Sequence, residues 1–362
     1  MKVLLAAPFG GVAGGISRWT GHIMNYYTSL QEKPCELTLL PMGRSSFVNI
    51  SSGLAYRIKT AFVDYKKILT SFNAMLRDND FDVMHLTSSA SISLLKDIYM
   101  IRQCRRRGIR SVVHFRFGRI PELAQQKNWE WKLLNKVVKM ADKVIVLDNS
   151  SYHVLVSCGY SNITMLPNPI SPEVLDIVSA NEDILREEKT ILFTGHVVKT
   201  KGVYELVEAC SEIDGVKLKF VGHVLDEVKE ELHRRAKCEL EVCGEMPYED
   251  VIKEMLSCDV FALPTYTEGF PNVILESMAA SCAIVTTDVG AIPQMLEPEG
   301  EKQYGIIIKP ENATLLKEAL VKMLGDEQLK SECRQNVRKR VVERYSIASI
   351  WEQMLQIWSE KY

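Results

Sequence analysis

Short apolar runs alternate with longer helical stretches along the first half of the chain. The runs predicted to be strands are Val3–Ala7, Leu37–Leu40, Val83–Leu86, Ser111–Phe115 and Lys143–Leu147. Runs of this kind, joined by helices, are typical of parallel strands that are buried on both faces. Asp148 then carries a side chain suited to a helix N-cap. The pattern predicts an α/β domain over residues 1–168.

The same pattern restarts after a proline-rich segment. Met165–Pro172 contains three prolines and is predicted to link two domains. Beyond it, strands that run toward a glycine or proline are expected at Thr190–Thr194, Leu218–Val221, Glu239–Val242, Val260–Leu263 and Ile284–Thr287. Ligands of open α/β sheets bind where the strands end. A second α/β domain is therefore predicted over residues 169–344, followed by an apolar helix over Ser346–Tyr362.

Composition narrows the function classes. A chain of 362 residues suits about two domains. No apolar run approaches the roughly 18–20 residues of a membrane-spanning helix. Met1–Ala7 is interpreted as a buried strand rather than a signal peptide, because Pro8 and several glycines follow at once. Nine cysteines without a C-x-x-C pair indicate free thiols in a reducing cytoplasm, and they are not expected to bind a metal.

Charge divides the chain into two unlike halves. Residues 1–180 carry 22 Lys/Arg and 13 Asp/Glu, whereas residues 181–362 carry 22 and 33. The difference predicts a first domain that faces something anionic. A basic amphipathic helix over Tyr56–Leu76 is compatible with an anionic membrane surface, although a solvated basic face explains the charge equally well. No nucleic-acid partner is expected, because the whole chain is slightly acidic and lacks a recognition motif.

Two glutamates bracket a predicted helix start. Glu268 lies in the preceding loop, Pro271 is expected to be the first helical residue, and Glu276 lies about five residues into the helix. At about 1.5 Å per residue, the carboxylates stand roughly 7 Å apart along the axis. A helix N-terminus binds phosphate, which would leave one carboxylate for a hydroxylated group on either side. A nucleotide sugar has this layout of hexose, diphosphate and ribose, although the spacing alone also occurs by chance.

The segment Glu268–Ala280 resembles the E-x7-E motif of the family 4 retaining glycosyltransferases, which adopt the two-domain GT-B architecture. The resemblance implies that Glu268 is catalytic and contacts hydroxyls of the donor hexose, and that Glu276 contacts the donor ribose. It also implies that the backbone around Phe270, Pro271 and Asn272 contacts the sugar and the phosphate.

The segment Gly195–Gly202 is similar to the G-R-x4-K-G motif of the same family. The resemblance places Gly195 and its neighbour at the donor and makes Lys201 the catalytic cation that stabilises the departing nucleoside diphosphate. That neighbour is His196 where the family usually has arginine. A neutral imidazole donates one hydrogen bond but supplies no permanent charge. Either phosphate binding is weaker here, or another cation compensates.

The N-terminal domain contributes two further predictions. Gly14 and Gly15 belong to a glycine-rich turn that resembles the one facing the donor phosphates in this family. A dinucleotide site is disfavoured because the G-x-G-x-x-G order is absent. His114 matches a catalytic histidine that reaches the donor sugar, although an isolated histidine is more often structural. His85 is interpreted as structural or as lining the acceptor.

The resemblance extends over nearly the whole chain. It implies two Rossmann-like domains facing each other across a cleft, with residues 169–344 binding the donor and helix 345–362 completing the acceptor-side domain 1–168. The implied reaction transfers a sugar from a nucleoside-diphosphate sugar to a hydroxyl of a lipid-linked or surface-polysaccharide glycan, with retention. No metal or cofactor is expected. The expected location is cytoplasmic, with peripheral attachment to the inner face of the membrane as a hypothesis. A GT-B epimerase or phosphorylase and a weak sugar-binding scaffold stay open as alternatives.

Overall fold

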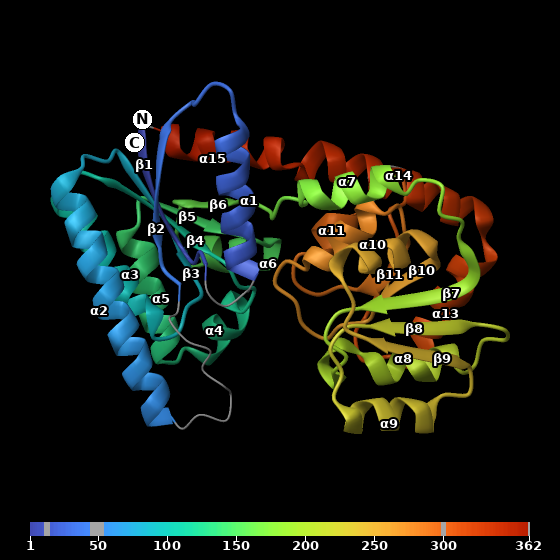
Figure 1. Ribbon diagram of the computed structural model, residues 1–362. Helices are drawn as coiled ribbons and strands as arrows, with labels where there is room; N and C mark the ends of the chain where they lie inside the picture. Colours follow the sequence, from blue (N-terminus) through green and yellow to red (C-terminus); the bar gives the residue numbers. More distant parts are fainter. Residues whose placement is uncertain (11–14, 44–53, 298–301, 361–362) are drawn as a thin grey trace. The chain divides into compact units, whose positions relative to one another are not determined.

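Parallel strands form the centre of each half of the chain. The computed structural model describes residues 1–10, 15–43, 54–297 and 302–360, without the side chains of residues 54–62. The chain divides into two units, the first made of residues 1–168 with 350–362 and the second of residues 169–349 (Figure 1). Each unit contains one six-stranded sheet with helices around it. The predicted α/β class is confirmed.

The first sheet is fully parallel and has the strand order β2-β1-β3-β4-β5-β6. Its strands are β1 Lys2–Ala7, β2 Glu36–Pro41, β3 Val83–Ser88, β4 Arg110–Phe115, β5 Lys143–Val146 and β6 Ile163–Met165. The order reverses direction between β1 and β3, which is the arrangement of a doubly wound sheet. Every residue of β3 is buried, in keeping with a strand covered on both faces.

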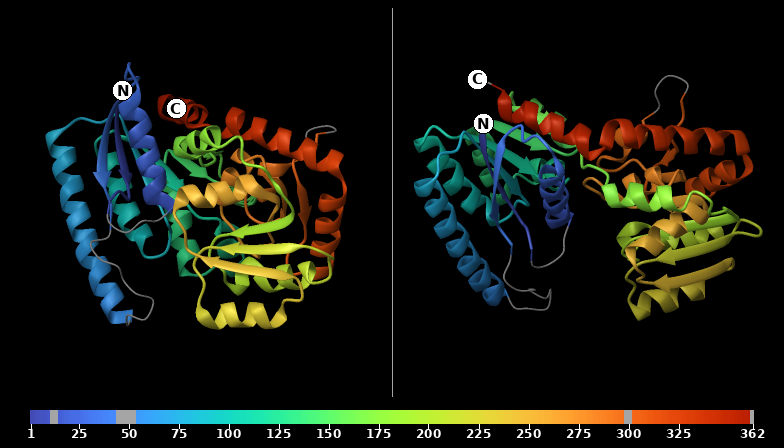
Figure 2. Two further views of the ribbon diagram at one scale, coloured as in Figure 1. Left: turned by 45° about the vertical axis from the view of Figure 1, so that its right-hand side comes forward. Right: turned by 45° about the horizontal axis from the view of Figure 1, so that its top comes forward.

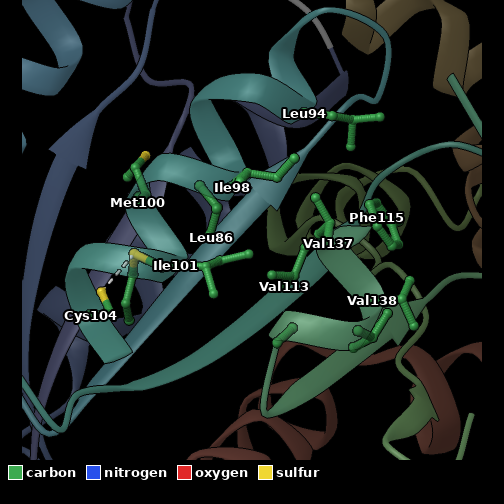
Figure 3. Close-up of a cluster of buried hydrophobic side chains, with 14 of the residues drawn as sticks. Leu86, Leu94, Ile98, Met100, Ile101, Cys104, Val113, Phe115, Val137 and Val138 are labelled. Atoms are coloured by element: carbon green, nitrogen blue, oxygen red, sulfur yellow. Dashed lines mark hydrogen bonds between the residues drawn. The ribbon is translucent and has the colours of Figure 1, made fainter. Parts of the chain in front are cut away.

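Helices cover both faces of this sheet. They are α1 Gly15–Ser29, α2 Leu54–Asp78, α3 Ser93–Arg106, α4 Ile120–Gln126, α5 Trp129–Met140, α6 Asn149–Ser157 and α15 Ile347–Ser359. Strand residues alternate between the faces. Leu86 and Val113 therefore meet Ile98 of α3 and Val137 of α5 in one apolar cluster (Figure 3). His85, between Met84 and Leu86, points to the opposite face, where it contacts Trp358 of α15.

The apolar side of α2 belongs to the same cluster. Ile68, Phe72 and Leu76 are buried in it, whereas Lys66 and Lys67 are exposed. A stripe that packs against its own domain is not available to lipid. The interpretation of these apolar residues as a membrane contact is therefore wrong, because they complete the core.

The second sheet is also parallel and has the order β12-β11-β10-β7-β8-β9. Its strands are β7 Glu187–Thr194, β8 Lys217–Val221, β9 Glu239–Gly244, β10 Cys258–Leu263, β11 Ala283–Thr287 and β12 Ile306–Ile308. Numbered within this unit, the order is that of a dinucleotide-binding doubly wound sheet, with its reversal between β7 and β10.

Helices also cover both faces of the second sheet. They are α7 Pro172–Ala180, the 3₁₀ helix η1 Lys199–Lys201, α8 Val203–Cys210, α9 Asp226–Arg235, α10 Tyr248–Ser257, α11 Asn272–Ala279, α12 Ile292–Leu296, α13 Ala313–Gly325 and α14 Glu327–Tyr345. Figure 1 shows α8 and α9 on one face of the sheet and α7, α10 and α11 on the other. The views of Figure 2 agree that α9 and α7 lie on opposite sides.

The strands β6 and β12 were not expected from the sequence. Each has three residues at an edge of its sheet, and β6 lies at the start of the segment interpreted as a linker. Three residues are too few to show a periodicity, so pairing with a neighbouring strand decides their conformation. Among the residues that the structure describes, no helix is both long enough and apolar enough to cross a bilayer.

Candidate functional site

The strand order of the second unit reverses between β7 and β10. These two strands pair in parallel, with Ile191 opposite Val260 and Leu192 opposite Phe261. At such a reversal the loops after the two strands diverge, and ligands bind at that edge. The residues that follow β7 are Gly195–Gly202, and those that follow β10 are Pro264–Pro271.

The segment after β7 holds Lys201 against the segment after β10. Gly202, which follows η1, has φ 70°. A Cβ added there would lie 2.0 Å from the carbonyl oxygen of Pro264, so only glycine allows this backbone approach. The N–H of Tyr266 donates to the carbonyl of Thr200 at 2.9 Å. Backbone contacts therefore fix Lys201 beside the loop that carries Glu268.

A third segment supports the same loop from β11. The N–H of Ala291 donates to the carbonyl of Gly269 at 2.9 Å. Gly290 has φ 56°, and a Cβ there would lie 2.4 Å from the carbonyl oxygen of Glu268. The main chain around Glu268 is thus held on one side by the β7 segment and on the other by the β11 segment.

Lys201 and Glu268 form an ion pair at this edge. Lys201 Nζ lies 2.5 Å from Glu268 Oε1, and the two side chains are 27% and 14% exposed. Partly exposed ion pairs contribute only about 0–1 kcal/mol to stability, so a ligand can replace one partner at little cost. The structure brings together the two side chains that the sequence made the strongest catalytic candidates. Their catalytic roles stay predictions.

Glu276 lies in α11, in the helix that follows this loop. Its Oε1 accepts a hydrogen bond from the hydroxyl of Tyr248, the first residue of α10, at 2.7 Å. Pro271 is the N-cap of α11 rather than its first helical residue, with φ −75° and ψ 109°. Proline has no N–H to leave unsatisfied at either position. Phe270 is buried, with its ring 6.0 Å from that of Tyr345, and Asn272 begins the helix.

His196 stands where the resembled family usually has arginine. The side chain is exposed, and its ring lies 6.0 Å from that of His223 in an edge-to-face arrangement. Gly195 precedes it at the end of β7, where its N–H donates to the carbonyl of Val221 at 2.9 Å. The role of His196 in donor binding stays a prediction.

The predicted glycine turn of the first unit is described only in part. Gly14 lies outside the described residues. Gly15 is the first residue of α1, and a Cβ there would meet no described atom within 4 Å. Packing in the described part of the chain therefore does not require glycine at position 15.

His114 is fully buried in a chain of polar side chains. Trp358 Nε1 donates to His85 Nδ1 at 3.0 Å, and His85 Nε2 lies 3.3 Å from His114 Nδ1. Burial lowers the pKa of His85 to about 3, with the Arg116 charge as a smaller cause. Burial also lowers the pKa of His114 well below its usual value, with smaller contributions from Arg116 and His85. Both imidazoles are therefore neutral near pH 7.

No metal-binding cluster is present in the described part of the chain, if a cluster means three or more His, Cys, Asp or Glu side chains placed to hold an ion. Asp78 and Asp80, which read as D-x-D in the sequence, lie at and just after the end of α2.

Comparison with known families gives one match, which lies inside the second unit. Residues 177–340 match the family described as Glycosyl transferases group 1. This part of the chain is similar to the group 1 glycosyltransferases. The matched residues include the segments after β7 and β10 and the whole of α11, so the Lys201–Glu268 pair lies inside the glycosyltransferase match.

The chain spans less than half the length of two curated relatives that it matches. The putative teichuronic acid biosynthesis glycosyltransferase TuaC of Bacillus subtilis is 31% identical over 147 residues, 40% of this chain and 36% of that protein. The N-acetylgalactosamine-N,N'-diacetylbacillosaminyl-diphospho-undecaprenol 4-alpha-N-acetylgalactosaminyltransferase of Campylobacter jejuni is 31% identical over 167 residues, 44% of each chain.

The solved structures extend the likeness to both units. HepE of Anabaena, in complex with UDP, superposes with a TM-score of 0.70 at 16% identity, covering 98% of this chain and 99% of that one. Likeness at this identity concerns the fold alone. The fold of this chain is the two-domain GT-B architecture.

Sequence reasoning missed two polar residues, one in each unit. Tyr248 was not singled out, because a tyrosine at a helix start carries no motif; only its contact with Glu276 identifies it. Arg116 is one of the basic residues of the first half, whose charge the sequence explains equally well by a solvated face or by an anionic partner. Its guanidinium lies 4.6 Å from the ring centroid of the buried Trp19. An arginine two residues after His114, at the end of a predicted strand, was the available signal.

Proposed function

We propose that this protein transfers a sugar from a nucleoside-diphosphate sugar to a hydroxyl acceptor, with retention of configuration and without a metal ion. The observation that carries the proposal is the Lys201–Glu268 pair at the strand reversal, with Glu276 in the adjoining helix α11. This part of the chain matches the glycosyltransferase family. In this arrangement a cation and a helix N-terminus serve the diphosphate, and two carboxylates serve hydroxyl groups.

Donor binding exchanges the partners of the resting ion pair. The diphosphate takes Lys201 Nζ from Glu268, and the freed carboxylate accepts hydrogen bonds from the donor hexose. Glu276, oriented by the Tyr248 hydroxyl, accepts from the ribose. Because Lys201 gains a more highly charged partner as the sugar–phosphate bond breaks, it stabilises the transition state more than the ground state.

The transfer proceeds on one face of the sugar. The bond between the anomeric carbon and the diphosphate oxygen breaks, and the acceptor oxygen forms its bond from the same side. The acceptor proton passes to the departing diphosphate, which therefore serves as the base. Glu268 is assigned to binding rather than to covalent attack, since its carboxylate, once freed from Lys201, accepts hydrogen bonds from the hexose hydroxyls.

The acceptor class is proposed from the named relatives. The Campylobacter enzyme acts on a sugar linked through a diphosphate to undecaprenol, and TuaC belongs to teichuronic acid biosynthesis. We infer a glycan acceptor of this kind, lipid-linked or part of a surface polysaccharide, and a cytoplasmic site of action.

Attachment to an anionic membrane is proposed through α5. Lys132, Lys136 and Lys139 are exposed at helical spacing, and Trp129 at the start of the helix is 53% exposed. Basic residues near an anionic surface contribute about 1 kcal/mol each. The purified protein should cosediment with phosphatidylglycerol vesicles at low salt, and a triple Lys→Glu change at these positions should abolish this. Equal binding by the triple variant would contradict this attachment.

The donor proposal is tested by thermal unfolding in EDTA with UDP, GDP, ADP and their common sugars. A ligand at 100 times its dissociation constant stabilises the folded state by about 2.7 kcal/mol. One nucleotide series should raise the melting temperature of the wild type and not of Glu276→Ala. Absence of a shift with every nucleotide would contradict the proposal and favour a scaffold. A shift that requires added Mg²⁺ would contradict metal independence.

A further inference from the structure

Arg116 is a cation that has no described carboxylate partner. It follows β4, and its backbone N–H donates to the carbonyl of Ser88, the last residue of β3, at 2.9 Å. Within the described residues its buried Nε has no hydrogen-bond acceptor, and no ion pair involves its guanidinium. The side chain as a whole is only partly buried, so a ligand can reach it.

The neighbour of Arg116 is also a donor. Indole Nε1 only donates, so His85 Nδ1 must accept from Trp358. The neutral His85 ring then carries its proton on Nε2, which donates to His114 Nδ1. His114, neutral as well, must carry its proton on Nε2. Arg116 Nη1 lies 3.4 Å from this nitrogen, so two donors face the same point with no acceptor between them.

A third donor belongs to the same group. Trp19 Nε1 is buried and has no hydrogen-bond acceptor among the described residues. Its ring packs edge-to-face on His114 at 5.4 Å and carries the Arg116 guanidinium over its face. Trp19 lies one turn into α1, whose N-terminal end attracts negative charge. Buried donors in proteins are normally satisfied, so three together call for an acceptor-rich, anionic ligand.

The position agrees with the topology of the first sheet. The order β2-β1-β3 reverses between β1 and β3. Helix α1 follows β1, and the backbone N–H of Arg116 is hydrogen-bonded to the last residue of β3. Ligands of doubly wound sheets bind at this reversal. Burial lowers the pKa of Arg116 to about 9, and no carboxylate opposes that effect. A charge held in this way costs stability, which argues against a purely structural role.

We propose that Arg116 and His114 Nε2–H bind a phosphate oxygen of a diphosphate-bearing ligand in the first unit. The inference rests on the proposed function, which supplies two candidate ligands. One is the sugar donor and the other is a lipid-linked acceptor, and each carries a diphosphate. A phosphate oxygen accepts several hydrogen bonds at once, and the planar guanidinium suits it.

Arg116→Met tests this inference, with Arg119→Met as the matched control. Arg119 lies on the same segment but is half-exposed and paired with Glu130 at 3.2 Å. Isothermal titration would use inorganic pyrophosphate, UDP and GDP, farnesyl diphosphate, and uridine and farnesol as ligands without phosphate. Arg116→Met should weaken pyrophosphate binding at least tenfold, Arg116→Lys by less, and Arg119→Met not at all. Its unliganded melting temperature should stay equal or rise, whereas loss of a structural arginine would lower it.

The titrations with different ligands distinguish the sugar donor from the lipid-linked acceptor as the source of the diphosphate. They also test the Arg116 inference separately from the proposed function. A tenfold loss for UDP or GDP but not uridine assigns the site to the donor, and a loss for farnesyl diphosphate but not farnesol assigns it to the acceptor. If Arg116→Met binds nucleotides, pyrophosphate and farnesyl diphosphate as tightly as the wild type does, the inference is overturned and the proposed function stands. Pyrophosphate binding lost in Arg116→Met without any nucleotide binding by the wild type supports the inference and contradicts the donor proposal. A wild type that binds no phosphate compound overturns both.

Discussion

The two units share a plan and differ in how they hold positive charge. Each has a six-stranded parallel sheet whose order reverses once, and each carries a cation beside that reversal. In the second unit Lys201 is partly exposed and paired with Glu268. In the first unit Arg116 has no carboxylate partner among the described residues. It lies beside the buried neutral His114, which in turn contacts the buried neutral His85. One site is neutral at rest, and the other holds unbalanced charge.

The difference in pairing implies that the two cations would bind a phosphate in different ways. Lys201 must release a carboxylate before it can hold a phosphate, so binding there is an exchange of partners. Arg116 releases nothing, so any phosphate that reaches it adds an interaction. The cost of the second solution falls on the stability of the unliganded first unit, because unpaired polar groups are kept away from water.

The largest expected effect comes from removing the paired cation. Lys201→Ala should lower the rate of sugar transfer by about 10²–10³-fold, because one fixed donor to a developing negative charge contributes about that much. The measurement is kcat with the nucleotide sugar that the thermal screen identifies. Lys199→Ala is the control, since Lys199 lies in the same 3₁₀ helix with an exposed side chain. Equal loss in both variants would mean that the segment, and not Lys201 Nζ, matters.

The second prediction separates the units by pH. The folded-state pKa values of His85 and His114 are lowered, so the unfolded chain binds more protons below its own pKa of about 6.5. The stability they preserve is complete above that pH and falls as the pH drops toward about 3. At pH 5.5 the first unit should lose about 1.4 kcal/mol per histidine, or about 3 kcal/mol for the pair, relative to pH 7.5.

Intrinsic fluorescence isolates this effect. All five tryptophans of the chain lie in residues 1–168 or 350–362, and so in the first unit. Urea unfolding followed by tryptophan emission at the two pH values therefore reports on that unit alone. His85→Gln should reduce the pH dependence by about half. An unchanged urea midpoint between pH 7.5 and 5.5 would show that the histidines are not held neutral.

The third prediction concerns the backbone beneath Glu268. Gly290→Ala should destabilise the second unit by about 2 kcal/mol, because it combines strain at positive φ with a Cβ pressed on the Glu268 carbonyl. Nucleotide affinity should fall with it, since the loop must move. Gly325→Ala is the control, as Gly325 ends α13 with open space around its Cβ. Alanine there should leave the melting temperature unchanged or raise it slightly.

Much of the second unit, and the strands of both units, could be predicted because they leave a local pattern in the sequence. Strands such as Val3–Ala7 and Val260–Leu263 are long apolar runs bounded by glycine or proline, and the structure has β1 and β10 there. Glu268 could be singled out because it lies in a loop between such a run and a predicted helix, and Lys201 because its segment resembles the G-R-x4-K-G motif. The structure joins the two side chains in one ion pair. Short edge strands β6 and β12 gave no period to detect.

The polar group of the first unit could not be predicted, for a different reason. Trp19, His85, His114, Arg116 and Trp358 come from α1, β3, β4, the loop after β4, and α15. Each position is ordinary in its own segment. Only the three-dimensional packing of the unit turns a surface-like arginine and a core histidine into facing donors.

The smallest expected effect comes from removing one tyrosine hydroxyl group in each unit. Tyr248→Phe removes the hydrogen bond to Glu276 Oε1, so the carboxylate is held less firmly toward the ribose. Nucleotide affinity should fall about fivefold, equivalent to about 1 kcal/mol, as for a single hydrogen bond. Tyr27→Phe removes the bonds of one hydroxyl in the first unit, which donates to the carbonyl of Cys35 at 3.1 Å and accepts from the N–H of Leu37 at 3.3 Å. It should lower stability by a similar amount without changing nucleotide affinity. Equal affinity in the two variants would mean that Tyr248 braces α10 against α11 rather than orienting the carboxylate, and the ribose role of Glu276 would then rest on Glu276→Ala alone.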